Sequence, residues 1–430
     1  MVRPARSADD ADLAARDAAL GVVRAALERR GGLEEALDRP PFANLDERER
    51  PFARMLAMTM LRRLGPIDAR LSGRMSKPPP ETVRMLLRLG VAQALYLDTP
   101  DFAAVDTTVR LAGRDRATRP FKGLINGVLR GLLREAHGED DPETLAPAWL
   151  LARWRAAYGE EEALAIAGMI ALEPATDLTL RDPADADALA PALRAMPLPG
   201  GSLRTALRGD VAGWPGYAAG RWWVQDAAAA IPARVLGAQA GEVVLDLCAA
   251  PGGKTLQLAA AGARVTALDR SAERLARLTA SLARTGLQAE TVAADVLSWS
   301  DQRKFDAVLL DAPCSATGTF RRHPDVLWAS RPGDIGSLAS LQSRLLGAGA
   351  DRVRAGGRLV YCVCSLEPEE GEAQVRAFLE RRPDFAVSPI ATGEGGAPAP
   401  SVLPSGMLRI LPTQLEGGLD GFFVARFVRS

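Results

Sequence analysis

The second half of the chain alternates between short β-rich runs and helical patterns. Most of the β-rich runs are separated by amphipathic stretches such as SAERLARLTASLART. The runs are VVLDL, ARVTALD, TVAAD, FDAVLLD and GRLVYCVCS, at residues 243–247, 263–269, 291–295, 305–311 and 357–365. Strands that alternate with helices predict an α/β domain whose mostly parallel sheet has helices on both faces. FFVARFVR, at residues 422–429, also alternates and is typical of an added antiparallel strand.

The first third of the chain has a different pattern. Residues 12–136 show apolar side chains recurring at three and four, with Gly or Pro at the breaks, which predicts an all-α bundle. Two more helices are expected before residue 174, and residues 182–202 have the Pro, Ala, Asp and Gly content of a linker or of small-subdomain loops. We therefore expect a multidomain protein with an all-α domain at 1–143, a small linker subdomain at 144–219, and an α/β domain at 220–430.

Composition limits the class of protein. A chain of 430 residues with 47% hydrophobic and 25% charged residues is typical of globular proteins with two or three domains. No apolar run is long enough to span a bilayer, and the first residues lack the apolar core of a signal peptide, so we expect a cytoplasmic protein without a membrane partner. Four cysteines in so long a chain do not form a disulfide framework and should be free thiols.

Charge is distributed unevenly although the net charge is zero. Basic residues outnumber acidic ones between 51 and 134, which favours a basic surface in the first third, or alternatively a set of solvated helix faces. Nearly all basic residues are Arg. Lysine occurs only at 77, 122, 254 and 304, so Lys254 stands out within its loop.

Acidic residues end successive predicted strands. Asp246 lies in the first strand, directly before a Gly- and Pro-rich turn, and Asp269, Asp295 and Asp311 end the next three. In open α/β sheets, ligands bind beyond the carboxyl ends of the strands. An acid about 20 residues past a glycine turn is the arrangement that binds the ribose hydroxyls of an adenosine cofactor. Carboxylates that are merely exposed at strand ends are the alternative, and their recurrence at consecutive strands argues against it.

The turn after the first strand, CAAPGGKT, excludes two other cofactor motifs. A phosphate-binding P-loop would need Gly at position 248, where Cys248 stands, and the turn lacks the GxGxxG of a dinucleotide site. The turn is therefore expected to lie close to the nucleoside of a cofactor that has no pyrophosphate. S-adenosylmethionine fits that description, and no metal is expected in the site.

Three ordered motifs resemble those of a known family. LDLCAAPGGKT, LLDAPCSATGTFRRHPD and YCVCSLEPEEGE, at residues 245–255, 309–325 and 361–372, resemble the motifs of the Sun/Fmu family of RNA cytosine-5 methyltransferases. GRWWVQDAAA at 220–229 and DGFFVARF at 420–427 resemble its flanking motifs. FAAVDTTVRLAG and KGLINGVLRGLLRE, within residues 102–135, resemble the NusB-like RNA-binding domain of the bacterial ribosomal members. The resemblance thus covers nearly the whole chain.

The resemblance implies a Rossmann-like methyltransferase domain that transfers a methyl group from S-adenosylmethionine to carbon 5 of a cytosine in RNA. The NusB-like domain makes 16S ribosomal RNA, free or in an assembling small subunit, the expected partner of a monomeric enzyme. The family's cofactor residues fall on the loop and on three strand-end acids, namely Cys248, Ala249, Ala250, Pro251, Gly252, Gly253, Lys254, Asp269, Asp295 and Asp311.

The same resemblance implies covalent catalysis by a thiol. Carbon 5 of cytosine becomes nucleophilic when a thiolate adds to carbon 6. The family's nucleophile falls on Cys364, the group that assists release on Cys314, and the hydrogen-bond partner of ring nitrogen 3 on Asp311. In DNA cytosine-5 methyltransferases a Pro-Cys pair carries the nucleophile, so Cys314 is the alternative. Cys248 and Cys362 are expected to be small packing residues.

Within the family motifs the chain departs from the common pattern at Ala316, Val363 and Gly371, and none of these removes a reactive group. In RRHPD and the residues after it, Arg321 and Arg322 are candidates for phosphate contacts, and His323 or Trp328 for base stacking; local packing of the loop is the alternative.

Two other functions remain compatible with the sequence. The same chemistry could act on transfer RNA or 23S ribosomal RNA, and only the NusB-like domain argues against that. A non-catalytic RNA-binding or antitermination-type module is the alternative from another class, although the intact Cys364, Cys314, Asp311 and cofactor loop argue against it.

Overall fold

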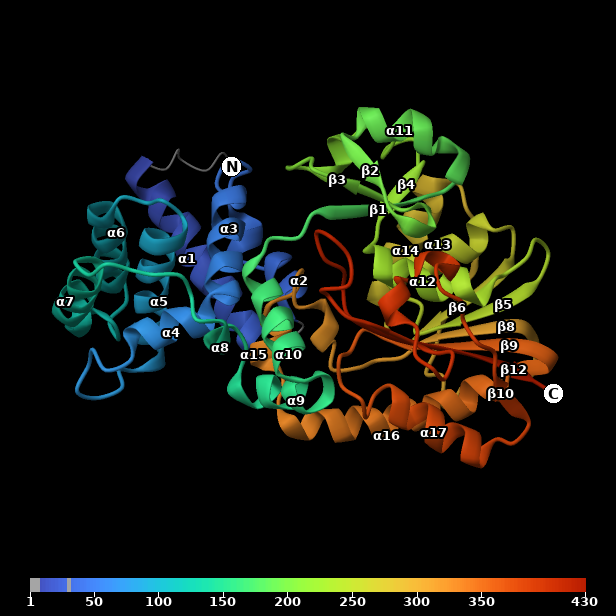
Figure 1. The fold of residues 1–430 in the computed structure, drawn as a ribbon. Helices are drawn as coiled ribbons and strands as arrows, with labels where there is room; N and C mark the ends of the chain where they lie inside the picture. Colours follow the sequence, from blue (N-terminus) through green and yellow to red (C-terminus); the bar gives the residue numbers. More distant parts are fainter. Residues whose placement is uncertain (1–7, 29–31) are drawn as a thin grey trace. The chain divides into compact units, whose positions relative to one another are not determined.

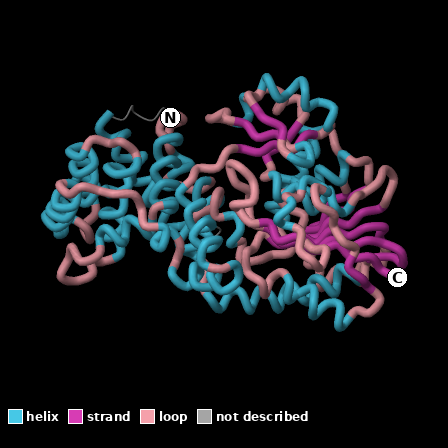
Figure 2. The backbone as a smooth tube through the Cα atoms, viewed as in Figure 1, coloured by secondary structure: helices cyan, strands magenta, loops and turns pink. Residues whose placement is uncertain are grey.

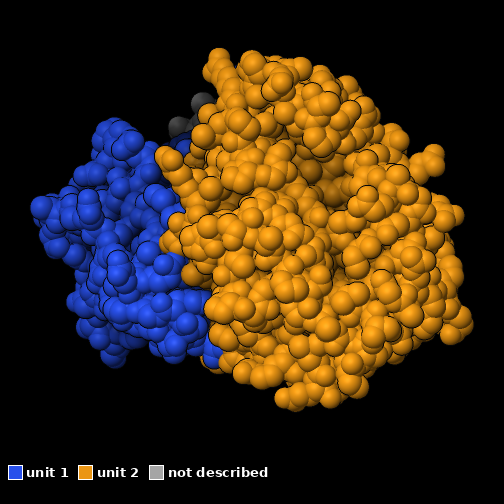
Figure 3. All heavy atoms as spheres, turned by 45° about the vertical axis from the view of Figure 1, so that its right-hand side comes forward, with its two compact units in different colours: residues 1–172, 323–330 blue, residues 173–322, 331–430 orange. Residues whose placement is uncertain are grey.

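The computed structural model describes residues 8–28 and 32–430. The chain forms two compact units, coloured separately in Figure 3. The first comprises residues 1–172 together with 323–330, and the second comprises residues 173–322 and 331–430. The predicted division at residues 143 and 219 stays a prediction.

The first unit is helical, as its sequence pattern predicts (Figures 1 and 2). Its described helices are α1 (Ala8–Leu27), α2 (Gly32–Leu37), α3 (Arg50–Arg62), α4 (Leu64–Leu71), α5 (Glu81–Tyr96), α6 (Asp101–Arg114), α7 (Lys122–Leu133), α8 (Pro142–Leu145), α9 (Ala148–Tyr158), α10 (Glu160–Gly168) and α15 (Asp325–Ala329). Short 3-10 turns lie at Phe42–Asn44, Arg119–Phe121 and Met169–Ala171. Among the residues that the structure describes, no helix combines the length and apolar character needed to cross a membrane.

Helix α5 is the centre of the first unit. Its residues from Met85 to Gln93 are all buried, so apolar side chains surround the helix rather than line one face. The two polar residues in this stretch are bonded to other helices: Arg88 binds Asp68 of α4, with 2.7 Å between Nη2 and Oδ2, and Gln93 accepts a hydrogen bond from Arg16 of α1 at 2.5 Å. A helix that is apolar on all sides is stable only when other helices surround it, which explains why α1, α3, α6 and α7 pack around α5.

A short segment from late in the chain completes the first unit. Residues 323–330 belong to it, although the residues on either side belong to the second unit. Asp325, which is buried, accepts a hydrogen bond from the backbone N–H of Leu33 at 3.1 Å in the first turn of α2. Helix N-termini leave such N–H groups without partners in the helix, so a carboxylate from a distant segment caps α2.

A small antiparallel sheet begins the second unit. Its strands are β1 (Thr176–Leu180), β2 (Ala195–Pro197), β3 (Leu203–Thr205) and β4 (Trp222–Val224), in the order β2-β3-β1-β4, with α11 (Ala186–Ala192) beside them. The loops predicted over 182–202 therefore include α11 and β2. A buried ion pair between Asp177 and Arg204, 2.7 Å apart, joins neighbouring strands, and Arg204 also donates to the carbonyl of Gly418. This sheet is thereby tied to the C-terminal part of the same unit.

The larger sheet contains the predicted strands. They are β5 (Val243–Leu247), β6 (Arg264–Asp269), β7 (Glu290–Ala293), β8 (Phe305–Asp311), β9 (Val353–Val363), β10 (Phe385–Val387), β11 (Leu408–Ile410) and β12 (Phe422–Arg429). The order is β10-β12-β9-β8-β5-β6-β7, with β11 paired to β12. Strands β5 to β9 are parallel and β12 is antiparallel to β9, which confirms the mostly parallel sheet with an added strand.

Helices cover both faces of this sheet, as expected (Figure 1). They are α12 (Ala227–Leu236), α13 (Gly253–Ala260), α14 (Ala272–Thr285), α16 (Pro332–Ala350) and α17 (Glu372–Arg381). Alternate side chains of β5 face the helices on opposite sides of the sheet. Val244 packs with α12 and α13, whereas Leu245 and Leu247 pack with α16 and α17. Each central strand is therefore apolar on both sides, and its polar residues collect at its ends.

The cap on α2 generates a prediction. In Asp325→Ala the Leu33 N–H loses its acceptor in a buried position, which costs about 1 to 2 kcal/mol of local stability. We expect faster amide hydrogen exchange across α2, measured residue by residue, and a lower melting temperature for the helical unit. Asp325→Asn is the matched control, because its amide oxygen can still accept. Unchanged exchange in Asp325→Ala would mean that Asp325 does not cap the helix.

Candidate active site

The predicted cofactor loop lies at the carboxyl end of β5. It connects Leu247 to α13, whose first residue is Gly253. Gly252 has φ 113°, and a Cβ there would lie 2.3 Å from Cδ1 of Leu278, so only glycine lets the loop turn against α14. Cys248 also has a positive φ, 59°, which is uncommon for a residue with a side chain.

Asp269 joins this loop to the next strand. Its carboxylate accepts hydrogen bonds from the backbone N–H groups of Ala250 at 3.1 Å and Ser271 at 2.9 Å. Because a carboxylate can accept about four hydrogen bonds, lone pairs remain for another donor. Asp295 follows β7, the neighbour of β6, and is exposed. These two predicted cofactor-binding acids therefore lie at adjacent strand ends.

Asp246 lies beneath the loop. Its side chain is fully buried, and Oδ2 accepts a hydrogen bond from the Thr255 hydroxyl at 2.5 Å. Its other oxygen, Oδ1, has no hydrogen-bond partner in the described part of the chain. Burial raises the pKa of Asp246 to about 7.

Lys254 and Asp311 form an ion pair at the centre of the strand ends. The Nζ of Lys254 lies 2.7 Å from Oδ2 of Asp311, and the thiol of Cys362 lies 3.4 Å from Oδ1. Burial opposes the charged ammonium, but the charge and hydrogen bond of Asp311, together with the nearby Cys362 and Cys364, outweigh it and raise the pKa of Lys254, which stays protonated at neutral pH. The lysine that stands out in the sequence thus has a specific partner.

The two cysteines assigned to catalysis lie side by side. The sulfur atoms of Cys314 and Cys364 are 3.4 Å apart although the residues are 50 positions apart in the sequence. Both are half-buried, and Cys364 directly follows the end of β9 at Val363. Position along the strand therefore separates Cys364, at the edge of the sheet, from Cys362, which is fully buried within it.

Three of the thiols have raised pKa values. Burial raises the pKa of Cys248 to about 12 and that of Cys362 well above its ordinary value. The hydrogen bond with Cys364, together with burial, raises the pKa of Cys314. Each of these three side chains is therefore a neutral thiol at neutral pH, and a neutral thiol is a poor nucleophile.

The two arginines of RRHPD have local partners. Arg321 is 2% exposed and donates to the carbonyl of Gly417, and Arg322 forms an ion pair with the buried Asp420. These contacts favour the packing alternative for both arginines. His323 and Trp328 belong to the helical unit.

Two of the departures from the family pattern have a structural correlate. Ala316 has φ 57°, a left-handed conformation that glycine adopts without strain and alanine does not. At Gly371 a Cβ would lie 2.4 Å from Nη2 of Arg409. The guanidinium of Arg409 therefore occupies the position that a side chain at residue 371 would need. Nothing in the structure explains Val363.

Sequence reasoning overlooked Glu370, which is fully buried and bonded to the residues that follow both cysteines. The motif that contains it was recognised, but a glutamate in an acidic run has the pattern of a solvated loop. Its burial and its hydrogen bonds to Ser315 and Ser365 identify it.

The chain is similar to known proteins over most of its length. A family described as 16S rRNA methyltransferase RsmB/F matches residues 233–428, and the NusB family matches residues 13–134. The ribosomal RNA small subunit methyltransferase B of Sodalis glossinidius is 38% identical over 418 residues, covering 91% of this chain and 92% of that protein. The protein of the same name from Salmonella arizonae is 36% identical, covering 96% and 98%.

The chain belongs to the RsmB/F family of 16S rRNA methyltransferases. Solved structures share the fold. PH0851 superimposes with a TM-score of 0.79 at 23% identity and 99% coverage of both chains. NSun6 from Pyrococcus horikoshii, solved with SFG, has a TM-score of 0.56 at 20% identity, covering 66% of this chain and 98% of that one.

The cofactor of this methyltransferase family is S-adenosylmethionine, and the RsmB/F site of this chain fits it. Carboxylates at successive strand ends are chemically suited to accept hydrogen bonds from ribose hydroxyls and an amino group, and the glycine turn brings backbone close to Asp269. The absence of a dinucleotide glycine pattern agrees with a cofactor that lacks a pyrophosphate.

Asp246 generates a prediction about pH. Its pKa of about 7 in the folded protein lies above the ordinary value of 3.8, so its protonated form favours folding. The contribution of this group to the unfolding free energy should therefore be largest below about pH 4 and fall as the pH rises toward 7, by at most about 1.4 kcal/mol per pH unit. Asp246→Asn is neutral and isosteric, and should lack this contribution.

The measurement is urea unfolding of both proteins between pH 4 and pH 8. The stability of Asp246→Asn relative to the natural protein should increase with pH over that range and level off above 7. Two parallel stability curves would show that Asp246 is ionised in the folded state at all these values.

Proposed function

We propose that this protein transfers the methyl group of S-adenosylmethionine to carbon 5 of a cytosine in 16S ribosomal RNA, with Cys364 as the covalent nucleophile. The observation that carries the proposal is the 3.4 Å approach of the Cys314 and Cys364 sulfurs beside the Lys254–Asp311 pair, at the cofactor edge of the sheet. A cytosine presented to this edge meets a nucleophile, a second thiol and a charged hydrogen-bonding pair.

Cys364 begins the reaction by adding to carbon 6 of the cytosine. The sulfur lone pair forms the new bond, and the electrons of the carbon 5–carbon 6 double bond make carbon 5 nucleophilic. When bound, S-adenosylmethionine supplies the electrophilic methyl group that carbon 5 takes. Cys314 keeps its own proton because its pKa is raised, so it does not compete with Cys364 as the nucleophile.

The Lys254–Asp311 pair supports ring nitrogen 3. An ionised carboxylate only accepts hydrogen bonds, so Asp311 must take up a proton before it donates one. The ammonium of Lys254 donates a hydrogen bond to Oδ2 of Asp311 at 2.7 Å and places a positive charge beside the ring. The pair thereby stabilises the negative charge that develops on the ring when sulfur adds.

Release reverses the addition. The proton on carbon 5 passes to a water molecule, its bonding electrons restore the carbon 5–carbon 6 double bond, and the bond from carbon 6 breaks with its electrons returning to the Cys364 sulfur. Cys314 is the group beside that sulfur, and its role is to assist this step. Because both faces of the base must be reached, the target cytosine is unpaired or flipped from its stack.

The first test uses Cys364→Ala. Removing the nucleophile should reduce transfer of labelled methyl groups to 16S ribosomal RNA to background, while binding of S-adenosylmethionine is retained. Scintillation counting measures the first quantity and calorimetry the second. Transfer at the natural rate would overturn the assignment, and bisulfite sequencing of the product from the natural protein identifies the base. Label found only on transfer RNA or 23S ribosomal RNA, or no label at all, would instead support the alternative functions.

Cys314→Ala tests the release step. We expect this variant to add to the RNA and methylate it but to release it slowly, so a covalent protein–RNA adduct accumulates and is seen as a shifted band in denaturing gels. The double variant Cys314→Ala with Cys364→Ala is the control and should form no adduct. An adduct in Cys364→Ala alone would exchange the roles of the two cysteines.

A further inference from the structure

The residues that follow the two cysteines share one carboxylate. Ser315 follows Cys314 and Ser365 follows Cys364, and both are buried. The backbone N–H of Ser315 donates to Oε1 of Glu370 at 2.9 Å, and the Ser365 hydroxyl donates to Oε2 at 2.5 Å. The Ser315 hydroxyl also binds Oε2. A single side chain therefore bonds to both cysteine-bearing loops.

The glutamate is itself held from two other elements. Gln342 of α16 donates through Nε2 to Oε1 of Glu370 at 2.9 Å and to the carbonyl of Pro313 at 2.9 Å. The hydroxyl of Tyr361 in β9 donates to the backbone carbonyl of Glu370 at 2.6 Å. The carboxylate is thus fixed relative to the sheet and to a helix, and Gln342 secures the residue before Cys314 as well.

Burying a carboxylate is energetically unfavourable unless hydrogen bonds or an ion pair satisfy its oxygens. Glu370 is 0% exposed, and no Arg or Lys lies within ion-pair distance of it among the residues that the structure describes. Its negative charge is balanced only by hydrogen bonds from Ser315, Ser365 and Gln342. Hydrogen bonds to a charged acceptor are short and directional, so they fix geometry more tightly than neutral contacts do.

We propose that Glu370 is a positioning residue that holds Cys314 and Cys364 at their working separation. It does not touch the sulfur atoms and acts through Ser315 and Ser365. The inference rests on the proposed function, because the separation matters only if both thiols serve one reaction. A displacement of the reacting atoms by about 1 Å can reduce a rate about 100-fold.

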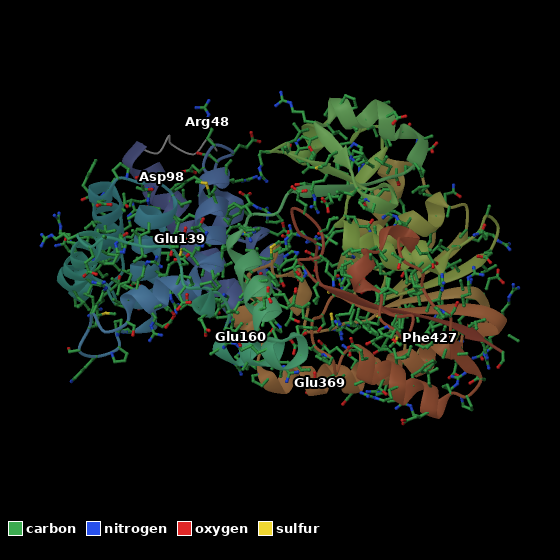
Figure 4. All side chains as sticks on the ribbon, viewed as in Figure 1. Arg48, Asp98, Glu139, Glu160, Glu369 and Phe427 are labelled. Carbon is green, nitrogen blue, oxygen red and sulfur yellow. The ribbon has the colours of Figure 1, made fainter. Side chains whose placement is uncertain are left out.

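Glu370→Gln tests the proposal without changing side-chain volume. The amide is neutral, and its NH₂ group replaces one acceptor with a donor that faces the serine hydroxyls. We expect kcat for methyl transfer to fall about 100-fold, while KM for S-adenosylmethionine and for RNA changes less than twofold. Glu369→Gln is the matched control, because Glu369 precedes it in the sequence and is exposed (Figure 4).

The outcomes are distinct. An unchanged kcat in Glu370→Gln overturns the proposal. A loss of rate accompanied by an equal loss of cofactor binding also overturns it, because Glu370 would then support the fold rather than the position of the thiols. The control Glu369→Gln is expected to match the natural protein in both measurements.

A second readout does not depend on methyl transfer. The oxidant diamide takes two electrons and two protons from a pair of neighbouring thiols, which become a disulfide, and it is reduced to a hydrazine. Without any substrate, the natural protein should form the Cys314–Cys364 disulfide, found by peptide mass mapping, at least tenfold faster than Glu370→Gln. Equal rates in the two proteins overturn the proposal even if the protein has another RNA substrate.

The serines provide a test that does not remove the buried carboxylate. Ser315→Ala and Ser365→Ala should each lower kcat and slow disulfide formation. Added to Glu370→Gln, each should cause little further loss, because the shared interaction is already broken. Losses that multiply independently would show that the serines and the glutamate act separately, and would overturn the proposal in a protein that remains folded.

Discussion

The parallel pairing of β8 with β9 is the constraint on which the site depends. Asp311 at the end of β8 lies opposite Cys362 in β9, and the chain continues from both strands on the same edge of the sheet. Backbone bonds prolong the pairing beyond the strands, from Ala312 N–H to the Cys362 carbonyl and from Gly318 N–H to the Cys364 carbonyl, both at 3.0 Å. The two cysteine loops therefore run beside each other, and Cys364 comes to lie 3.4 Å from Cys314.

Close backbone packing accompanies that pairing. A Cβ at Gly318 would lie 2.1 Å from the carbonyl oxygen of Gly421, and these two residues are joined by a backbone hydrogen bond of 2.8 Å. The segment before β12 thus lies directly against the first cysteine loop. The antiparallel strand β12 extends the sheet, and the backbone just before it, at Gly421, packs against the Cys314 loop at Gly318.

The charged side chains at the centre of the site are buried or half-buried, and each is stabilised by specific partners. Lys254 and Asp311 neutralise each other, whereas Glu370 is stabilised by hydrogen bonds alone among the described residues. Unpaired buried charge is strongly unfavourable, so such groups persist where their bonds connect elements that must keep a fixed geometry. Here those elements are the cofactor loop, the end of β8 and the two cysteine loops.

The sequence by itself determined the periodic part of the structure: the helical first third, the parallel strands, the acids at their carboxyl ends and the motifs that indicate the family. These follow from local spacing, because strand and helix periodicity are properties of neighbouring residues. The proposal of Cys364 rather than Cys362 as the nucleophile rests on the same motifs. Only the tertiary structure decided which distant groups meet. Three contacts illustrate this: Lys254 pairs with Asp311, Asp325 caps α2, and Glu370 bonds to both cysteine loops. Each joins segments that are far apart in the sequence, and the pattern within one segment does not indicate which distant segment it will contact.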